Sequence, residues 1–461
     1  MTQSSFSVRG KQVTVVGAAR SGLAAIDLLQ ARGARVTLAD AAPSLDGAES
    51  LRARGVQVDL GPHRPDQFTR AHLIVLSPGV PADQDAIAHA RSAGIPVIGE
   101  LELASRWLTG RVIAITGTKG KSTTTTLTSR MLTAGGFHAP AGGNIGAALS
   151  AQVEESTPDT VHVVETSSFQ LETIETFHPW IAVLVNLSAD HIDRHGTFEA
   201  YASAKARIFE NQTSADWAVV NADDPASLSL AAKARAQRFD FALDAPVTDG
   251  VTVEGSSIVR RTGGSSAPLV PLSAIQVPGR HLLSDVLAAT AVGCIAGVPA
   301  EAMVRAVEGF HGLAHALERV GSVQGVMFVN DSKATNIVSA TRSIESFERD
   351  VVVILGGKHK GGRFEDLRDV VRERCVAVVA IGEAAPLVTE ALSDVVTVRQ
   401  ASSMSDAVRQ AWGMAPVGGT VLLAPACASF DMFRDYAARG AAFVEEVRRL
   451  SDGQSSVLAP R

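Results

Sequence analysis

Short apolar segments alternate with Gly-rich turns and amphipathic stretches along much of this chain. The first apolar segment covers residues 12–17, an amphipathic stretch follows at 22–29, and a second apolar segment covers 35–40. Continuous apolar strands that alternate with helices predict a parallel sheet covered on both faces. Comparable apolar segments recur at 112–117, 351–356, 376–382 and 420–424. We therefore expect an α/β protein built on mainly parallel sheets.

The recurrence of this pattern in each third of the chain suggests three domains. A length of 461 residues agrees with that number, at about 150 residues per domain. A helical pattern that ends near Gly309–Gly312 indicates the second boundary. We expect domains at 1–108, 109–312 and 313–461, with a polar hairpin or loop at 261–268.

Composition narrows the class of protein. Apolar residues make up 46% of the chain and mean hydropathy is +0.15, which excludes a disordered chain. A net charge of −6 argues against general nucleic-acid binding, which needs a basic surface. The first residues lack a secretory signal pattern, and the apolar runs are much shorter than the ~20 residues of a membrane-spanning helix. Three widely spaced cysteines are interpreted as free thiols, which is typical of a cytoplasmic protein. Taken together, these features predict a cytoplasmic protein without nucleic-acid partners and without membrane insertion.

A candidate phosphate-binding loop follows the apolar segment at 112–117. Glycines allow backbone N–H groups to turn toward phosphate oxygens, and the start of a helix adds partial positive charge. Lys121 would neutralise the outer phosphates and the Ser122 hydroxyl would bind Mg²⁺. The strict pattern has Gly where Ile115 stands, so this is a shortened loop; the alternative is a Gly-rich turn with a solvated lysine. The residues expected to contact ATP here are Gly117, Thr118, Lys119, Gly120, Lys121, Ser122 and Thr123.

Three further polar residues have two interpretations each when they are considered without relatives. Glu165 follows an apolar strand, where it would serve either as an Mg²⁺ ligand or as a helix-capping acid. His191 follows another strand, and a lone histidine is more often structural than catalytic. Lys205 lies in a helical pattern and by itself is interpreted as a surface lysine.

Six strings of residues match one protein family in order along the chain. They are GTKGKS at 117–122, GGNIG at 142–146, SSFQLE at 167–172, NLSADHIDRH at 186–195, DSKATN at 331–336 and PACASFD at 425–431. In this combination the chain, from about Val13 to its last helix, resembles the Mur ligase family. Members of that family use ATP to form an amide bond through an acyl phosphate.

The resemblance implies a fold and a reaction. The fold would be a Rossmann-like N-terminal domain, a central P-loop domain and a Rossmann-like C-terminal domain. These would bind a UDP-linked substrate, ATP and an amino acid, respectively. SSFQLE, DSKATN and PACASFD resemble the branch that adds D-glutamate to UDP-MurNAc-L-Ala in peptidoglycan precursor synthesis. The expected partners are therefore UDP-MurNAc-L-Ala, D-glutamate and ATP, with Mg²⁺ as cofactor and a monomeric enzyme.

The resemblance also implies roles for individual residues, which are grouped here by ligand. The residues implied in catalysis are Lys121, His191, Lys205 and Lys333, and Asp285 and Asp331 join the ATP contacts. The contacts to the UDP-linked substrate would be Arg20, Ser21, Asp40, Ser77, Asn144, Ser167, Gln170 and His191. The contacts to D-glutamate would be Thr335, Lys360, Ser429, Phe430 and Tyr436. The metal ligands would be Ser122, Glu165, His191 and, if carbamylated, Lys205.

The chain departs from the family pattern at a few positions. Leu282 and Asp285 stand where relatives usually carry Asn, and Ala316 stands where relatives carry Arg, with Arg319 nearby as a substitute. Three alternatives therefore stay open. They are a sister Mur ligase or folylpolyglutamate synthetase that uses another amino acid, a P-loop kinase or ATPase, and a non-catalytic nucleotide-binding scaffold.

Overall fold

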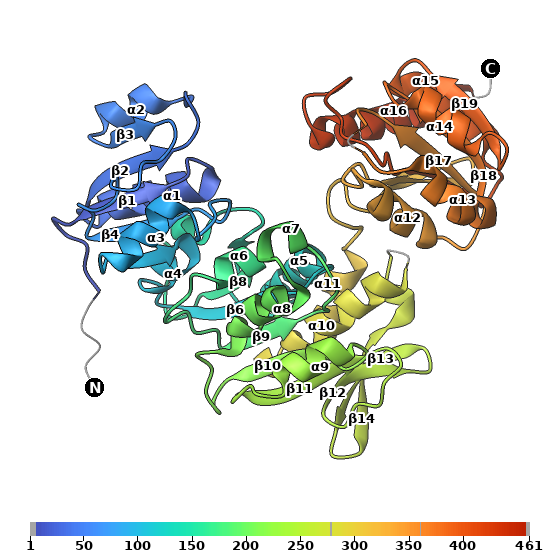
Figure 1. The fold of residues 1–461 in the computed structure, drawn as a ribbon. Coiled ribbons are helices and arrows are strands. Elements are labelled where there is room, and N and C mark those ends of the chain that lie inside the picture. Colours follow the sequence, from blue (N-terminus) through green and yellow to red (C-terminus); the bar gives the residue numbers. More distant parts are fainter. Residues whose placement is uncertain (1–5, 277–278, 360, 458–461) are drawn as a thin grey trace. The chain divides into compact units, whose positions relative to one another are not determined.

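The computed structural model describes residues 6–276, 279–359 and 361–457 (Figure 1). Its contacts divide the chain into two compact units, one of residues 1–274 with 284–307 and the other of residues 275–283 with 308–461. The first unit contains two sheets and the second unit contains one. The expectation of an α/β fold on mainly parallel sheets is confirmed.

The first sheet is entirely parallel, with strand order β3-β2-β1-β4-β5. Its strands are β1 Gln12–Val16, β2 Arg35–Asp40, β3 Gln57–Leu60, β4 Leu73–Leu76 and β5 Val97–Gly99, and its helices are α1 Arg20–Ala31, α2 Ala48–Ala53, α3 Asp85–Ser92 and α4 Glu100–Ser105. The predicted elements at 12–17, 22–29 and 35–40 are β1, α1 and β2. Because the chain continues from β1 to β2 on one side and later to β4 on the other, the strand order reverses at β1, and ligands bind at the carboxyl end of such a strand in open α/β sheets.

The second sheet has nine strands in the order β14-β13-β12-β11-β10-β9-β6-β8-β7. The strands are β6 Arg111–Thr116, β7 Ala141–Gly143, β8 Val161–Glu165, β9 Ile181–Leu184, β10 Trp217–Asn221, β11 Gln237–Ala242, β12 Gly250–Glu254, β13 Ser257–Thr262 and β14 Ser265–Pro271. The pairs β12–β13 and β13–β14 are antiparallel and the other pairs are parallel. The predicted hairpin at 261–268 is the β13–β14 turn, where Gly263 and Gly264 both adopt positive φ.

The helices beside this sheet begin with α5 directly after the phosphate-loop pattern. They are α5 Lys121–Ala134, α6 Ser168–Leu171, α7 Ile192–His195, α8 Phe198–Ala206, α9 Pro225–Ala231, α10 Arg280–Ala296 and α11 Ala300–Glu308, with short 3₁₀ turns at Leu149–Gln152, Arg207–Phe209 and Leu272–Ala274. Strand β6 lies between β8 and β9, so the strand order also reverses at β6. The carboxyl end of β6 is therefore the place where an open α/β sheet binds its ligand.

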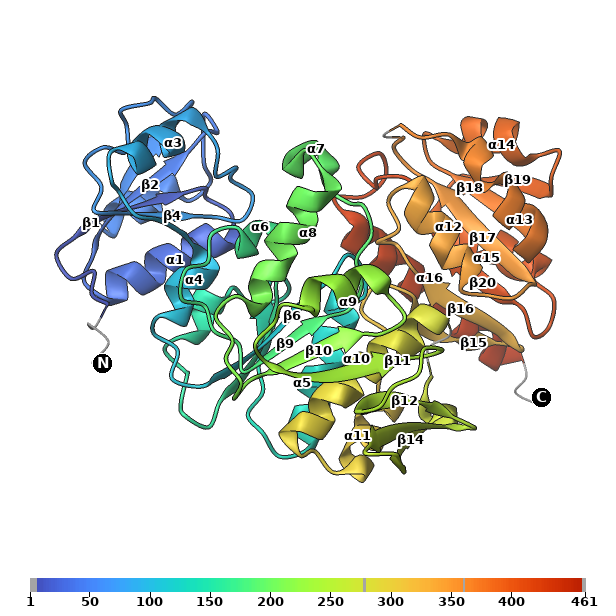
Figure 2. The ribbon, with the colours of Figure 1, turned by 60° about the horizontal axis from the view of Figure 1, so that its bottom comes forward.

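The sheet of the second unit has the order β15-β16-β20-β17-β18-β19. Its strands are β15 Glu318–Val323, β16 Val326–Asn330, β17 Val351–Gly356, β18 Cys375–Ile381, β19 Thr397–Ala401 and β20 Thr420–Leu423, and its helices are α12 Ile337–Glu345, α13 Arg368–Arg374, α14 Ala385–Leu392, α15 Met404–Met414 and α16 Tyr436–Val457, with a 3₁₀ turn at Phe364–Leu367. Only β15 is antiparallel to its neighbour among these described strands. Figure 2 shows α16 beside β15 and β16, where Phe443 and Val447 join the core.

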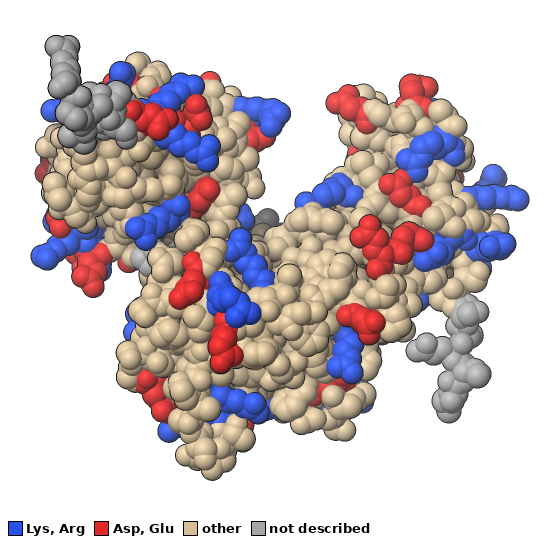
Figure 3. Space-filling view, turned by 180° about the vertical axis from the view of Figure 1, so that it is seen from behind, with Lys and Arg blue, Asp and Glu red and all other residues tan. Residues whose placement is uncertain are grey.

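Charged side chains are interspersed on the face shown in Figure 3, where Lys and Arg alternate with Asp and Glu. The net charge of −6 is not gathered in one broad region of that face. Among the described residues, no helix is both long enough and apolar enough to cross a membrane.

Candidate active site

The predicted phosphate loop connects β6 to α5 and is held by neighbouring backbone. The Lys121 ammonium donates to the carbonyls of Gly117 and Thr118, at 3.0 Å each. From the segment after β9, the Asn186 carbonyl accepts from the Thr118 N–H at 3.0 Å, and its side chain accepts from the Lys119 N–H at 2.9 Å. The first N–H groups of a helix point toward its N-terminus, so the start of α5 is suited to binding an anion.

Helix α5 forms although four consecutive threonines occupy its first turns. Thr124 and Thr125 are completely buried, as is Thr128 in the next turn. β-Branched residues have low helix propensity, so packing against the sheet rather than propensity stabilises this helix.

Gly120 ends the loop in a conformation that requires glycine. Its φ is +80°, and a Cβ built on it would lie 2.0 Å from Oδ1 of Asp285. Asp285 is only 3% exposed, and burial raises the pKa of its carboxyl well above the usual range. The structure therefore brings Asp285 to the phosphate loop, where it fills the space that the glycine leaves.

Three predicted residues from three segments meet beside the loop. The Ser122 hydroxyl donates to Oε2 of Glu165 at 2.7 Å, and the Asn144 amide donates to Oε1 of the same carboxylate at 2.8 Å. Glu165 ends β8, which is paired with β6, and Asn144 follows β7, which is paired with β8. The parallel register thus places a carboxylate, a hydroxyl and an amide at one edge of the sheet.

Lys205 is where the interpretation from the bare sequence is wrong. Its side chain is not on the surface but 2% exposed, and its ammonium nitrogen donates to the Gly117 carbonyl at 2.7 Å. Helix α8 packs so that Lys205 lies under the phosphate loop and over the ring of Tyr201, at 4.7 Å. Burial, together with the nearby charge of Lys121, lowers the pKa of Lys205 to about 7.

His191 precedes α7 in the left-handed region, at φ 52°, with an exposed side chain. Its ring lies edge-on to Phe169, 5.0 Å between centroids. Within the described residues it makes no hydrogen bond to Ser122 or Glu165, so the structure does not bring it into their cluster. Among the described residues, we find no group of three or more His, Cys, Asp or Glu side chains that could hold a metal ion by itself.

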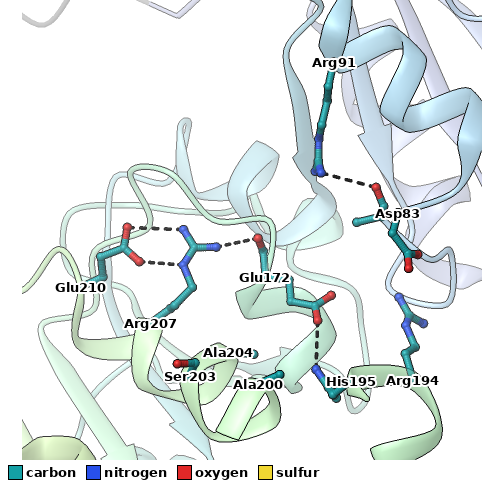
Figure 4. Close-up of a pocket in the computed structure, with 11 residues that line it drawn as sticks. Asp83, Arg91, Glu172, Arg194, His195, Ala200, Ser203, Ala204, Arg207 and Glu210 are labelled. Atoms are coloured by element: carbon teal, nitrogen blue, oxygen red, sulfur yellow. Dashed lines mark hydrogen bonds and ion pairs between the residues drawn. The ribbon is translucent and has the colours of Figure 1, made fainter. Parts of the chain in front are cut away.

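A cavity of about 680 Å³ lies beside α7 and α8, and Figure 4 shows its lining side chains. Glu172 forms an ion pair with Nδ1 of His195 at 3.1 Å, and burial raises the pKa of Glu172. Arg194 stacks over Phe169 at 4.1 Å and donates to the Val80 carbonyl at 3.0 Å. Phosphate-loop residues do not line this cavity, which instead joins the SSFQLE and DHIDRH segments to the loop after β4.

The turn after β1 is held by two of the residues predicted to contact the UDP-linked substrate. The Ser77 hydroxyl donates to the Gly17 carbonyl at 2.8 Å, and Oδ2 of Asp40 accepts from the Ala18 N–H at 2.6 Å. Arg20 and Ser21 begin α1 at the same turn. Ser77 and Asp40 thus position the turn with their own polar atoms, while direct contacts to a substrate stay a prediction.

Ser167 and Gln170 also bond to each other. The Ser167 hydroxyl accepts from the Gln170 N–H at 3.2 Å, and the Gln170 side-chain oxygen accepts from the Ser167 N–H at 2.9 Å. This capping box begins the short helix α6. Gln170 is buried, and its amide nitrogen has no partner among the described residues.

In the second unit the predicted amino-acid contacts lie at the carboxyl ends of β16 and β20. The Asp331 carboxyl accepts from the Ser343 hydroxyl, and burial raises the pKa of Asp331 to about 6. Ser429 is buried, whereas Phe430 and Tyr436 are exposed. Thr335 is partly exposed and Lys333 is exposed. The remaining predicted contact, Lys360, lies outside the described residues.

Comparison with known proteins agrees with the motifs. Family models match for the Mur ligase MurD-like N-terminal domain over residues 11–99, the Mur ligase middle domain over 115–293 and the Mur ligase glutamate ligase domain over 317–427. The chain is 44% identical to the UDP-N-acetylmuramoylalanine–D-glutamate ligase of Koribacter versatilis, over 97% of this chain and 99% of that protein. The chain belongs to the Mur ligase family.

Other Mur ligases support this assignment. The UDP-N-acetylmuramoylalanine–D-glutamate ligase of Acidobacterium capsulatum is 44% identical over 96% of this chain and 97% of that protein. The solved MurF ligase of Thermotoga maritima in complex with ADP shares the fold, with a TM-score of 0.59 at 16% identity over 97% of this chain and 96% of that one.

Sequence reasoning missed two residues that shape the Mur ligase phosphate site. Asn186 holds the phosphate loop, and its position after a strand next to β6 was the available signal. The Tyr201 hydroxyl lies 3.0 Å from the hydroxyl of Thr118, and burial raises the pKa of Tyr201 to about 12. Tyr201 lies one helical turn before Lys205, so the spacing of four residues places both side chains on one face.

Proposed function

We propose that this Mur ligase adds D-glutamate to UDP-MurNAc-L-Ala with ATP as the phosphate donor. The observation that supports this most directly is the meeting of Ser122, Glu165 and Asn144 beside a phosphate loop, in a chain 44% identical to named D-glutamate ligases. The alanyl carboxylate of the substrate attacks the γ-phosphorus of ATP, the bond to the bridging oxygen breaks, ADP leaves and the carboxylate becomes an acyl phosphate. The D-glutamate amine then attacks the acyl carbon, the amide forms and phosphate leaves.

The phosphate loop stabilises the charge that develops on the transferred phosphate. We propose that backbone N–H groups of Gly117–Thr123 bind phosphate oxygens and that the Lys121 ammonium turns from the loop carbonyls to the γ-phosphate. Asp285 supports this loop from behind Gly120. Lys333 and Asp331, from the second unit, are proposed to contact ATP during transfer.

Mg²⁺ fits the donors that the structure gathers. A carboxylate and a hydroxyl are oxygen ligands that Mg²⁺ prefers, and Mg²⁺ commonly completes its shell with waters and phosphate oxygens. Ser122 and Glu165 would hold the ion, and we propose His191 as a further contact if its exposed segment moves toward them. The ion would supply neutralisation of phosphate charge when bound.

Lys205 is proposed to carry a carbamate. A pKa of about 7 leaves a large fraction of the amine neutral near neutral pH, and only the neutral amine adds CO₂. The neutral nitrogen attacks the CO₂ carbon and releases one proton, which converts the amine into a negatively charged carbamate. That carbamate, close to Gly117, would be a second oxygen ligand beside the phosphates.

The remaining assignments complete the proposal. The domains at 1–108, 109–312 and 313–461 would bind the UDP-linked substrate, ATP and D-glutamate in turn. The turn after β1, with Arg20, Ser21, Asp40 and Ser77, is proposed for the uridine nucleotide, and Asn144, Ser167, Gln170 and His191 for the rest of that substrate. Thr335, Lys360, Ser429, Phe430 and Tyr436 are proposed for D-glutamate. We also propose that the enzyme is a cytoplasmic monomer.

One assay tests the reaction. Purified protein is incubated with ATP, Mg²⁺ and UDP-MurNAc-L-Ala, and phosphate release is measured with and without D-glutamate. We expect phosphate release that depends on D-glutamate. The rate of this release should fall by at least about 10²-fold in Lys121→Ala and should match that of the wild type in the surface control Lys233→Ala.

Each other outcome identifies a different function. A rate of phosphate release that does not depend on D-glutamate would indicate a kinase or ATPase. Turnover with L-lysine or meso-diaminopimelate, or of folate with glutamate, but not of UDP-MurNAc-L-Ala with D-glutamate, would indicate a sister ligase. ATP binding without turnover on any of these acceptors would indicate a scaffold.

A further inference from the structure

Three loops that are far apart in sequence meet at one edge of the second unit. The strands β16, β20 and β17 are adjacent and parallel, so their carboxyl ends lie side by side. The loops that follow them are 331–336, 425–431 and, after β17, the described residues 357–359 and 361–362. Backbone hydrogen bonds join these loops in pairs, from Ala426 N to Ala334 O at 2.9 Å and from Lys358 N to Ala428 O at 2.8 Å.

One side chain from α16 bonds to two of these loops at once. The Arg439 Nε donates to the Ser332 hydroxyl at 2.9 Å, and one Nη donates to the Ser332 carbonyl at 2.9 Å. The other Nη donates to the carbonyls of Cys427 and Ala428, at 3.0 and 3.2 Å. The Ser332 hydroxyl in turn donates to the Tyr436 carbonyl at 2.8 Å, at the start of α16.

The third loop packs on the same guanidinium group. Gly357 has a φ of +128°, and a Cβ built on it would lie 3.0 Å from Nη1 of Arg439 and 2.3 Å from the Ala428 carbonyl. The glycine therefore allows its loop to approach the arginine closely. Arg439 thus bonds to two of the loops and lies close to the third at Gly357, and its planar fork holds their spacing in a way that a flexible side chain does not.

Burying this cation is costly, which argues against a passive role in packing. Arg439 is 1% exposed, and its four acceptors are neutral oxygens rather than carboxylates. Burial lowers the pKa of Arg439 to about 10. Burying a charge costs much free energy unless the charge is paired and hydrogen-bonded, so the four hydrogen bonds of Arg439 are needed to hold it here.

We infer that Arg439 is the positioning residue of the amino-acid pocket, which sets the distance between Ser332 and Ser429 and so determines the affinity for D-glutamate. This rests on the proposed function, in which the flanking residues Thr335, Ser429 and Tyr436 contact D-glutamate. Arg439 itself touches no substrate. It acts through the loops, and its buried positive charge favours an anionic amino acid nearby.

The test compares kinetic constants of Arg439→Lys and Arg439→Ala with those of the wild type. A lysine keeps the charge but not the fork, so it leaves part of the hydrogen bonds unmade. We expect the KM for D-glutamate to rise by about 10²-fold in both variants, because displacement of positioning groups by about 1 Å has effects of this size. The Kd of ATP, measured by calorimetry without the other substrates, is expected to stay within about twofold.

The control is Arg449→Ala on the same helix, where the side chain is exposed and pairs with Glu445 and Glu446. Its KM values are expected to match those of the wild type. Guanidinium ions at millimolar concentration are expected to lower the KM for D-glutamate in Arg439→Ala, whereas urea is not. This rescue is measured on folded protein, so it does not depend on how much of the variant folds.

The outcomes separate this inference from the proposed function. If the wild type shows no D-glutamate dependence, the proposed function fails and the assignment of the pocket fails with it. If the wild type depends on D-glutamate but the soluble Arg439 variants keep its KM, or raise all KM values equally, the positioning role is overturned while the function stands. An Arg439→Ala variant with a lower melting temperature, an unchanged KM and no rescue would make Arg439 structural only.

Discussion

Replacing Gly120 by alanine tests the geometry of the phosphate loop most directly. The φ of +80° at this position costs about 1–2 kcal/mol for an L-residue. The new Cβ would lie 2.0 Å from Oδ1 and 2.8 Å from Cγ of Asp285, so something must move. Overpacking of a closed site costs about 1–3 kcal/mol. Together the two effects are expected to destabilise the wild-type loop conformation by about 2–5 kcal/mol.

This strain is expected to appear as weaker ATP binding. If the loop changes shape to relieve it, the lower value of about 2 kcal/mol corresponds to an affinity loss of about 30-fold. Asp285 has little room to move because its side chain is buried. The Kd of ATP is measured by isothermal titration calorimetry, and the melting temperature of the same sample is recorded.

A second substitution separates the two causes. In Gly120→Ala/Asp285→Ala the clash is removed and the backbone cost of about 1–2 kcal/mol remains, so part of the affinity should return. Gly413→Ala serves as the control, because this glycine lies inside α15 with no atom within 4 Å of its added Cβ. That variant should gain about 0.5–1 kcal/mol in stability. Wild-type ATP affinity and melting temperature in Gly120→Ala would refute the described loop.

Three further predictions concern other parts of the first unit. Burial alone would raise the pKa of Glu102, but hydrogen bonds from Glu175, Thr176 and Arg106 lower it. In Glu102→Ala the free energy of unfolding, measured with urea, should fall by about 2–4 kcal/mol. The stability of the wild type should fall as the pH drops through this lowered pKa. The pKa of Lys205 is about 7 in the folded protein and 10.5 in the unfolded chain, so the unfolded chain binds more protons between these values. Without bicarbonate, the free energy of unfolding should therefore rise between pH 7 and 10, by at most ~1.4 kcal/mol per pH unit. In Lys205→Met this rise should be smaller. Ser77→Ala removes the donor to the turn after β1, so the KM for UDP-MurNAc-L-Ala should rise several-fold while the KM for ATP stays unchanged.

Local patterns were sufficient for the elements and for the loops that follow the strands. The apolar segments at 12–17, 112–117, 351–356 and 420–424 are strands, because a buried parallel strand needs an almost continuous apolar run. The carboxyl end of a strand at a reversal of strand order is where ligands bind in such sheets. The motif residues Ser122, Asn144 and Glu165 were therefore predictable as a group, and the structure brings them together.

Residues that act through burial were not predictable in the same way. Lys205 by itself has the pattern of a solvated helix surface, because its environment is created by the packing of α8 beneath a loop 88 residues away in sequence. Arg439 belongs to no recognised motif, and its contacts with Ser332 cross 107 residues. Such contacts carry no local periodicity, so nothing in the neighbouring sequence indicates them.

The sequence by itself thus determined the α/β class, the order of the elements and the family, since these follow from periodicities and strings within a few tens of residues. Tertiary structure alone decided that Asp285 lies behind Gly120, that Lys205 is buried, and that Arg439 bonds to two loops at once. The physical reason is that solvation and long-range hydrogen bonding depend on which segments pack together. Those same contacts set the pKa values and the spacing of polar groups on which the proposed chemistry depends.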